Sequence, residues 1–200
     1  MPESAVQRPN VPARCSIGRV STPADLLRPL RRTRQYREFT TEPVERASLN
    51  AIADVGRWSG SSENTQPWRF IAITDTAVLR QLESMGLPST RSLKTATAGI
   101  AIVLPDEKGK QVSYAFDEGR AAERMLIAAG MIDLGAGIAW IRADIRDAVG
   151  ELFDLPPDRF IRTIVALGHP TEAARRPKSA AGKARLPREE TVFEERWPKG

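Results

Sequence analysis

The chain has 200 residues, and its 41% hydrophobic content suits one globular domain that can bury a core without metals or disulfides. The single cysteine, Cys15, has no second thiol to pair with, which excludes a disulfide framework and favours a reducing compartment, the cytoplasm. No apolar run approaches the roughly 20 residues needed to cross a bilayer, and the N-terminal stretch lacks an apolar run of the kind expected of a signal peptide. We therefore expect no membrane partner.

The formal charge is +5, from 30 Lys and Arg against 25 Asp and Glu, which raises the question of polyanionic partners. Basic residues gather at residues 28–37 and 175–188, without a nucleic-acid motif and without interleaved aromatic residues. These two clusters could converge on one small anion, or they could be solvated surface. A nucleic-acid adaptor is the least favoured interpretation, and we expect no nucleic-acid partner.

Residues 1–20 lack apolar periodicity and predict a flexible tail in front of one domain that spans residues 21–200. The hydroxyl cap and proline of residues 21–23 predict the start of a helix that runs to about Arg32 and is weakened at Pro29. Residues 41–43 repeat this start signal. A second helix is expected from there to Gly56.

Strands and helices alternate through the rest of the domain. Aromatic and branched residues bounded by turn residues predict strands at 68–74, 98–104, 138–141 and 160–167. The second of these is apolar throughout, so it should lie centrally in a sheet. Helical periodicity predicts helices at 76–85, 117–134 and 144–153. We expect Gly135 to end the long helix and Asp144 to cap the last one.

From about residue 171 the chain becomes a polar, basic C-terminal extension. It ends with three apolar residues, Val192, Phe193 and Trp197, which are too few to form a core of their own. Such a segment needs a surface to lie against. That surface could belong to its own subunit or to a partner subunit.

The sequence lacks the residues required for several common kinds of catalytic and binding site. The only histidine is His169, so a Ser-His-Asp triad or a Cys-His dyad would have to use this residue. With one Cys and one His at opposite ends of the chain, no metal site is expected. No phosphate loop or dinucleotide fingerprint follows any predicted strand. Difficult chemistry would therefore belong to a bound cofactor.

The most unusual segment is the loop at residues 59–68, Ser-Gly-Ser-Ser-Glu-Asn-Thr-Gln-Pro-Trp. By itself it would be explained by turn chemistry, since small polar residues satisfy loop backbone. It occurs, however, together with Arg-Gln-Tyr-Arg-Glu-Phe at 34–39 and with Asn64-x-Gln66-Pro67-Trp68. With these motifs the chain resembles the flavin-dependent nitroreductase family.

The resemblance continues in the family's order to the end of the chain, and it covers about residues 24–200. It includes Asp-x-Gly-x-Ala-Ala at 117–122, Leu-Gly-Ala-Gly-Ile-Ala-Trp-Ile at 134–141, Leu-Gly-His-Pro at 167–170, Lys-Ala-Arg-Leu-Pro at 183–187 and Glu-Arg-Trp at 195–197. The chain departs from the family most in the stretch from Leu82 to Lys94, which is short and lacks a recognisable asparagine to read the flavin's pyrimidine edge, and it also departs at four single positions. These are Thr33 for an arginine, Gln35 for a serine, Gly60 for a proline and His169 for a tyrosine.

The resemblance implies an α+β fold with a mixed β-sheet wrapped by helices, in an intertwined homodimer that binds FMN at the subunit interface. It assigns the phosphate and ribityl contacts to basic residues, which suit a doubly charged phosphate, and the approach from the neighbouring subunit to the 59–68 loop. The backbone of residues 137–139 would lie along the reactive N5 edge of the flavin. The implied cofactor-binding residues are Arg34, Gln35, Arg37, Ser61, Ser62, Asn64, Gly137, Ile138, Ala139, Lys183 and Arg185.

The resemblance also implies an FMN-dependent oxidoreductase that takes hydride from NADH or NADPH and passes it to a nitroaromatic, a quinone or another small electrophilic acceptor, in ping-pong fashion. No side chain is expected to be catalytic, because the flavin carries the chemistry. Tyr114 and Phe116 are candidates for the substrate face, with aromatic packing as the alternative. Arg91 or Lys94 could read the pyrimidine edge of the flavin.

Two interpretations stay open beside these. Trp58 and Trp140 are simplest as core or interface residues. The second hypothesis for function is a protein of the same fold that sequesters FMN with little or no turnover. Reduction of the bound flavin by NADH or NADPH would distinguish an oxidoreductase from a protein that only sequesters FMN.

Overall fold

The computed structural model describes residues 22–180, 183 and 185–198. The predicted N-terminal tail, its boundary at residue 20, and Cys15 lie outside the described residues. The chain divides into two compact units, one that ends at Arg32 and one that begins at Thr33.

The first unit contains two short helices, α1 (Pro23–Leu26) and α2 (Arg28–Arg32). The Thr22 hydroxyl accepts a hydrogen bond from the Asp25 N–H at 3.2 Å, and the Asp25 carboxylate accepts one from the Thr22 N–H at 3.1 Å. This reciprocal cap confirms the expected helix start. The helix is interrupted at Leu27, because Pro29 has no N–H to donate and its ring crowds the preceding turn.

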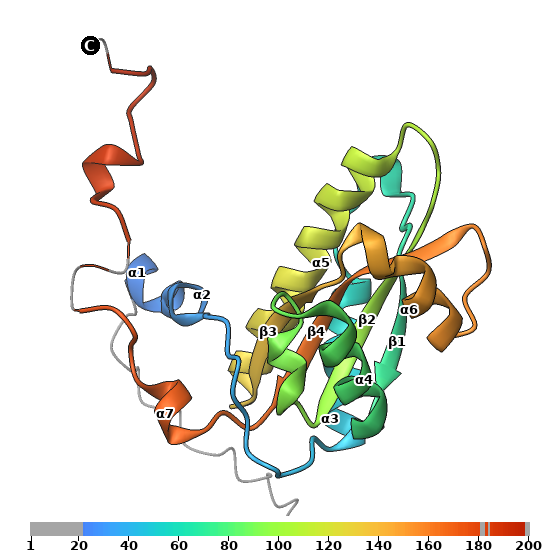
Figure 1. Cartoon of the computed structure of the whole chain (residues 1–200). Helices are drawn as coiled ribbons and strands as arrows, with labels where there is room; N and C mark the ends of the chain where they lie inside the picture. Colours follow the sequence, from blue (N-terminus) through green and yellow to red (C-terminus); the bar gives the residue numbers. More distant parts are fainter. Residues whose placement is uncertain (1–21, 181–182, 184, 199–200) are drawn as a thin grey trace, which may run out of the picture. The chain divides into compact units, whose positions relative to one another are not determined.

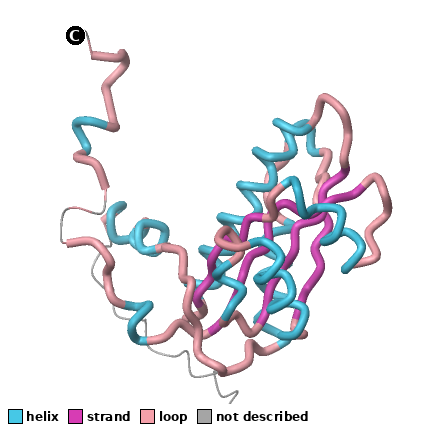
Figure 2. The backbone as a smooth tube through the Cα atoms, in the orientation of Figure 1, coloured by secondary structure: helices cyan, strands magenta, loops and turns pink. Residues whose placement is uncertain are grey.

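The second unit is built on one four-stranded sheet in the order β1-β2-β4-β3 (Figures 1 and 2). All neighbouring strands pair antiparallel. β2 is buried along nearly its whole length, which confirms the expected central strand. The strands are β1 (Arg69–Ile73), β2 (Ala98–Pro105), β3 (Gly135–Trp140) and β4 (Arg159–Gly168).

Helices cover both faces of this sheet (Figure 1). α3 (Arg46–Arg57) and α5 (Gln111–Met131) pack on one face, and α4 (Thr76–Gly86) and α6 (Arg146–Leu152) pack on the other. Each face has its own apolar cluster, centred on residues such as Ile100 and Ile164. The α+β expectation is confirmed. The shorter helices are η1 (Ser62–Asn64), η2 (Arg91–Lys94), η3 (Ala143–Ile145), α7 (Glu172–Arg175) and η4 (Arg188–Glu190).

Two helices begin at places other than the sequence predicts. α3 begins at Arg46 rather than at the 41–43 signal, because residues 42–45 run extended and the Glu42 carbonyl accepts a hydrogen bond from the Thr97 hydroxyl. α5 begins at Gln111 rather than at Asp117. Its first two residues are exposed, Val112 to 85%, so the apolar stripe does not extend to the start of the helix.

The prediction that Gly135 ends the long helix is wrong. α5 ends at Met131, Asp133 adopts the left-handed conformation with φ of 60°, and Gly135 is the first residue of β3. A Cβ at Gly135 would lie 2.5 Å from the Pro170 ring. Close packing of β3, and not helix termination, therefore requires glycine at this position.

The prediction that Asp144 caps a helix is also wrong. α6 begins at Arg146, after the 3-10 turn η3, and no side chain caps it. Asp144 instead accepts two hydrogen bonds from the Arg142 guanidinium, at 2.7 and 3.0 Å. This ion pair lowers the pKa of the Asp144 carboxyl and raises that of Arg142.

Residues 33–40 run along the outer edge of β3. The Tyr36 N–H donates to the Ala136 carbonyl at 2.7 Å in a parallel bridge between Gln35 and Ala136, and Phe39 bridges Pro170. This bridge is isolated and lies outside the named strands, so within the described residues parallel pairing occurs only here and the four-stranded sheet itself is antiparallel, not mixed as expected. A Cβ at Gly137 would lie 2.0 Å from the Tyr36 carbonyl oxygen, so the close approach of the two segments requires glycine there.

Candidate functional site

A cavity of ≈ 340 Å³ opens at the outer edge of β3. Main-chain contacts close this edge on both sides of the cavity, since Ala136 bonds Tyr36 and the Trp140 N–H donates to the Ser89 carbonyl at 3.2 Å. Ile138 lies between these two contacts. The lining residues come from three separate segments and are Arg37, Pro88, Ser89, Arg91, Ser92 and Ile138.

The cavity is electropositive. Arg37 and Arg91 are both exposed, and no ion pair joins either guanidinium to a carboxylate within the part of the chain that the structure describes. Ser92 is 1% exposed, and its hydroxyl has no hydrogen-bond partner among the described residues. Buried hydroxyls normally have a partner. The site therefore suits an anionic ligand rich in oxygen atoms, which guanidinium groups bind through charge-assisted hydrogen bonds.

The Ile138 N–H points out of the sheet at this cavity. It donates a hydrogen bond at 3.2 Å to the side-chain amide oxygen of Gln35. Of the three strand residues that the resemblance assigns to the flavin edge, only Ile138 lines the cavity. Gly137 and Ala139 are buried, and the space beside Gly137 is taken by the Tyr36 carbonyl.

The other predicted basic residues do not line this cavity. Arg34 donates a hydrogen bond to the Arg175 carbonyl, and its guanidinium lies 4.9 Å from the centre of the Tyr36 ring. Lys183 and Arg185 are exposed in the C-terminal segment. The structure thus brings Arg37, Gln35 and Ile138 together and leaves the remaining predicted cations elsewhere in the chain.

The loop that contains Ser61, Ser62 and Asn64 forms a second, separate site candidate. The buried Asp117 carboxylate of α5 accepts a hydrogen bond from the Ser62 N–H at 3.0 Å, and the Ser61 hydroxyl accepts one from the Gln66 N–H at 2.9 Å. Three non-glycine residues of this loop have positive φ values: 52° at Glu63, 55° at Asn64 and 47° at Gln66. Such strain persists only where the surroundings impose it, and it is common at ligand sites.

Gly60, where the resemblance expects a proline, faces the guanidinium of Arg120. A Cβ at Gly60 would lie 2.4 Å from its Nη2 atom. Arg120 also lies 3.5 Å from the Asp117 carboxylate that holds the loop. The glycine therefore leaves room for a cation that contacts the residue organising this loop.

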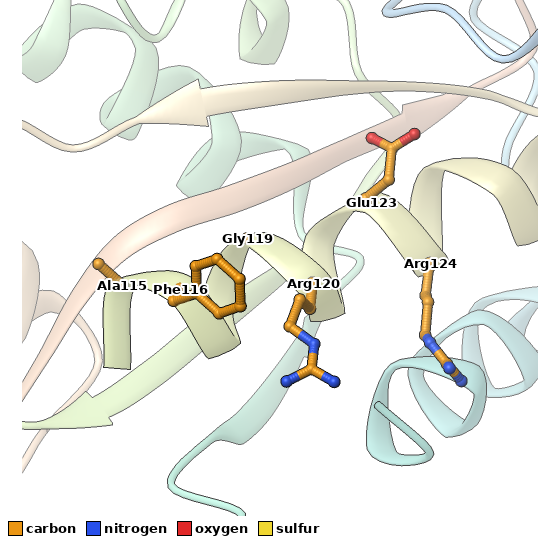
Figure 3. A pocket seen from close by; sticks show the side chains of 6 residues that line it. All are labelled: Ala115, Phe116, Gly119, Arg120, Glu123 and Arg124. Carbon is orange, nitrogen blue, oxygen red and sulfur yellow. The ribbon is translucent and has the colours of Figure 1, made fainter. Parts of the chain in front are cut away.

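Tyr114 and Phe116 have different surroundings on α5. Tyr114 is buried, and its hydroxyl donates to the Glu107 carboxylate at 2.6 Å, a bond that raises the pKa of the phenol. Its contacts match the packing alternative. Phe116 is 71% exposed and lines a shallow hollow of ≈ 520 Å³. Figure 3 shows Arg120 and Arg124 extending from one side of this helix while Glu123 points the other way.

Trp58 and Trp140 are not core residues of this chain, which contradicts one of the two alternatives. Trp58 is 68% exposed and Trp140 is 47% exposed. A contact with another subunit stays a prediction for both.

Sequence reasoning missed a buried ion pair between α5 and β4. The Arg162 guanidinium donates to the Glu118 carboxylate at 2.7 Å, and both side chains are almost fully buried. Burial raises the pKa of Glu118 and lowers the pKa of the neighbouring Arg146. No local signal marks this pair, because its members are 44 residues apart.

Two further classes of site were searched for in the described residues. They contain no group of three or more His, Cys, Asp or Glu side chains that could hold a metal ion. None of their helices combines the length and the apolar character that a membrane span requires.

Comparison with known proteins gives a consistent result. Residues 30–96 match the Nitroreductase family, and this range includes Arg37, Arg91 and Ser92. The chain is 27% identical over 146 residues to an Archaeoglobus fulgidus protein described as an NADH dehydrogenase/NAD(P)H nitroreductase, with 70% of this chain and 82% of the relative covered.

Two solved structures share the fold at lower identity. An FMN-dependent nitroreductase from Clostridium difficile R20291 superposes with a TM-score of 0.73 at 21% identity, over 84% of this chain and 98% of that one. The NADPH:FMN oxidoreductase from Vibrio harveyi, complexed with NAD+, superposes with a TM-score of 0.69 at 22% identity, over 83% and 75% of the two chains.

Proposed function

We propose that this chain, of which residues 30–96 match the Nitroreductase family, is an FMN-dependent oxidoreductase that uses NADH or NADPH to reduce a small electrophilic acceptor, such as a nitroaromatic or a quinone. The names of its relatives support FMN and a nicotinamide donor. The observation that carries the proposal is the cavity beside β3, with its two arginines and its buried hydroxyl.

The residues at this cavity fit part of FMN. Arg37 and Arg91 offer charge-assisted hydrogen bonds to a phosphate or to a carbonyl edge, and the Ser92 hydroxyl needs a partner of the kind that FMN carries. The volume of ≈ 340 Å³ is at the small end of the roughly 300–1,000 Å³ that ligand pockets occupy. Groups from outside this cavity would then complete the site.

FMN, when bound, supplies a ring that accepts hydride from a nicotinamide and later donates it to a second substrate. The residues of the chain itself would bind FMN and orient it. The lining residues contain no side chain that titrates near neutral pH, so none of them serves as a general acid or base there. Their positive charge would stabilise negative charge on the ligand.

A homodimer would supply the missing half of the site. The 61–64 loop is held in a strained conformation, yet it does not line the cavity of its own chain. The C-cap of α3 exposes Trp58, and α5 exposes Val112 and Phe116, apolar side chains that suit a subunit contact. In this proposal the loop of one subunit approaches the FMN held by the other. Sedimentation of the purified protein measures whether the mass is twice that of the chain.

The test is a visible spectrum of the purified protein incubated with FMN, followed by addition of NADH and then NADPH without oxygen. Bleaching of a bound flavin band by either nucleotide supports the proposal and justifies a screen of acceptors. A bound flavin that neither nucleotide reduces favours the FMN-sequestering alternative. If no flavin binds, the proposed function is wrong.

A further inference from the structure

One residue at the outer edge of β3, Ile138, lines the cavity. Antiparallel pairing directs alternate residues of an edge strand away from their partner strand. In β3 these residues are Ala136, Ile138 and Trp140. The Ala136 carbonyl accepts a hydrogen bond from the Tyr36 N–H, and the Trp140 N–H donates one to the Ser89 carbonyl. The Ile138 N–H instead donates to a side chain, the amide oxygen of Gln35.

This hydrogen bond lies where a ligand would contact the strand. Ile138 lines the cavity together with Arg37, which is two residues beyond Gln35 in the chain. The Gln35 side chain is exposed and is fixed only through its backbone bridge and this one bond. A backbone N–H makes one well-aligned hydrogen bond. A ligand acceptor that bonds Ile138 must therefore displace the Gln35 oxygen.

We propose that Gln35 is a displaceable cap on the Ile138 amide, which competes with the flavin for this donor. The inference rests on the proposed function, because it assigns the cavity to FMN. In the flavin-free protein the Gln35 oxygen accepts the hydrogen bond of this amide. A bound flavin would take this donor only if the Gln35 side chain gave up its hydrogen bond and turned towards solvent. Gln35 is thus a positioning residue that lowers flavin affinity.

The first readout is flavin affinity, measured by quenching of FMN fluorescence. Gln35→Met keeps the length of the side chain and removes the oxygen. FMN should bind this variant about 2- to 12-fold more tightly than the wild type, the size of one net hydrogen bond. Riboflavin should gain by the same factor, because the competition concerns the ring and not the phosphate.

The second readout is hydrogen exchange of the Ile138 amide, which does not depend on activity. In the wild type the amide should be protected with and without FMN. In Gln35→Met it should be protected only when FMN is bound. Gln35→Glu retains an acceptor, so protection of the flavin-free amide should return.

The matched control is Gln111→Met. Gln111 is also an exposed glutamine whose side-chain oxygen accepts a backbone N–H, that of Gly109 at 2.9 Å, but it does not line the cavity. Removal of the Gln111 side-chain oxygen should leave the affinity for FMN unchanged.

The outcomes separate the two proposals. Equal or weaker FMN binding by Gln35→Met, or an Ile138 amide that stays unprotected in its FMN complex, would overturn the role of Gln35 and leave the proposed function standing. Failure of the wild type and of every variant to bind FMN would overturn both.

Discussion

Arginines in two regions of this domain have opposite surroundings. Between α5, β4 and α6, Arg162 is buried against the Glu118 carboxylate, and its guanidinium also lies 5.6 Å from the centre of the Phe160 ring. At the β3 cavity, Arg37 and Arg91 are exposed and lie beside the unpartnered Ser92 hydroxyl, with no carboxylate of the described residues paired to them.

The difference separates charge that belongs to the fold from charge that is available to a ligand. A buried cation must be neutralised within the protein, because removal from water costs several kcal/mol. A cation at the mouth of a cavity keeps its hydration until a ligand replaces it. The formal charge of +5 does not distinguish these cases, and the pairing of individual arginines does.

The largest expected effect is on the buried arginine. Arg162→Met should lower the free energy of unfolding by about 3–5 kcal/mol at neutral pH, because it leaves the Glu118 carboxylate buried without its cation. Urea unfolding measures this. Arg159→Met on the same strand removes an ion pair of 3.6 Å with the exposed Asp158 and should change stability by less than about 1 kcal/mol.

The same variant has a pH signature. Burial raises the pKa of Glu118, so the folded protein takes up a proton more readily than the unfolded chain does. The stability that this group contributes is therefore present at acid pH and is lost as the pH rises from the ordinary pKa of a glutamate through the raised one. Without Arg162 the pKa should rise further. The deficit of Arg162→Met should shrink between pH 8 and pH 5, and a deficit independent of pH would argue against this account.

The next effect is on ligand binding. Arg37→Met and Arg91→Met should each weaken FMN binding by about 10- to 150-fold, the size of a hydrogen bond to a charged group, while the free energy of unfolding changes by less than about 0.5 kcal/mol. Fluorescence titration with FMN and with riboflavin shows which arginine meets the phosphate, since that variant loses affinity for FMN alone. A lower free energy of unfolding with unchanged FMN affinity would show instead that these arginines stabilise the fold and do not bind the ligand.

The smallest effect is expected at a paired arginine on the surface. Arg57 lies 2.8 Å from Asp54, and both side chains are more than half exposed. Arg57→Met should therefore change the free energy of unfolding by less than about 1 kcal/mol and leave FMN binding unchanged. Thermal unfolding at two protein concentrations checks this. A larger loss that depends on concentration would place Arg57 and its neighbour Trp58 in a subunit interface.

The sequence predicts the parts of the fold that depend on composition within one segment. The apolar run at 98–104 identifies the central strand because burial on both faces requires it. The motif at 34–39 predicts Arg37 at the site. Helix starts were less predictable, since Asp144 has the residue type of a cap but pairs with the long side chain of Arg142.

Contacts between distant segments could not be predicted. Gln35 and Ile138 are 103 residues apart, and nothing in either segment indicates that a side chain will bond that amide. Ser92 resembles any serine in a short loop, and only its burial without a partner marks it. Gly137 was expected to lie along the flavin edge, whereas the Tyr36 carbonyl occupies the space beside it.

The covered edge of β3 has a consequence for solubility. An edge strand with a row of open backbone groups is a template on which strands of other molecules can add, and proteins commonly protect such edges. Here Ala136 and Trp140, each two residues from Ile138, are already bonded to the chain's own backbone. A gap one residue long is too short for a foreign strand to pair with, although it is wide enough to admit a small molecule. The protein can thus keep a ligand site open on its sheet without offering that edge to aggregation.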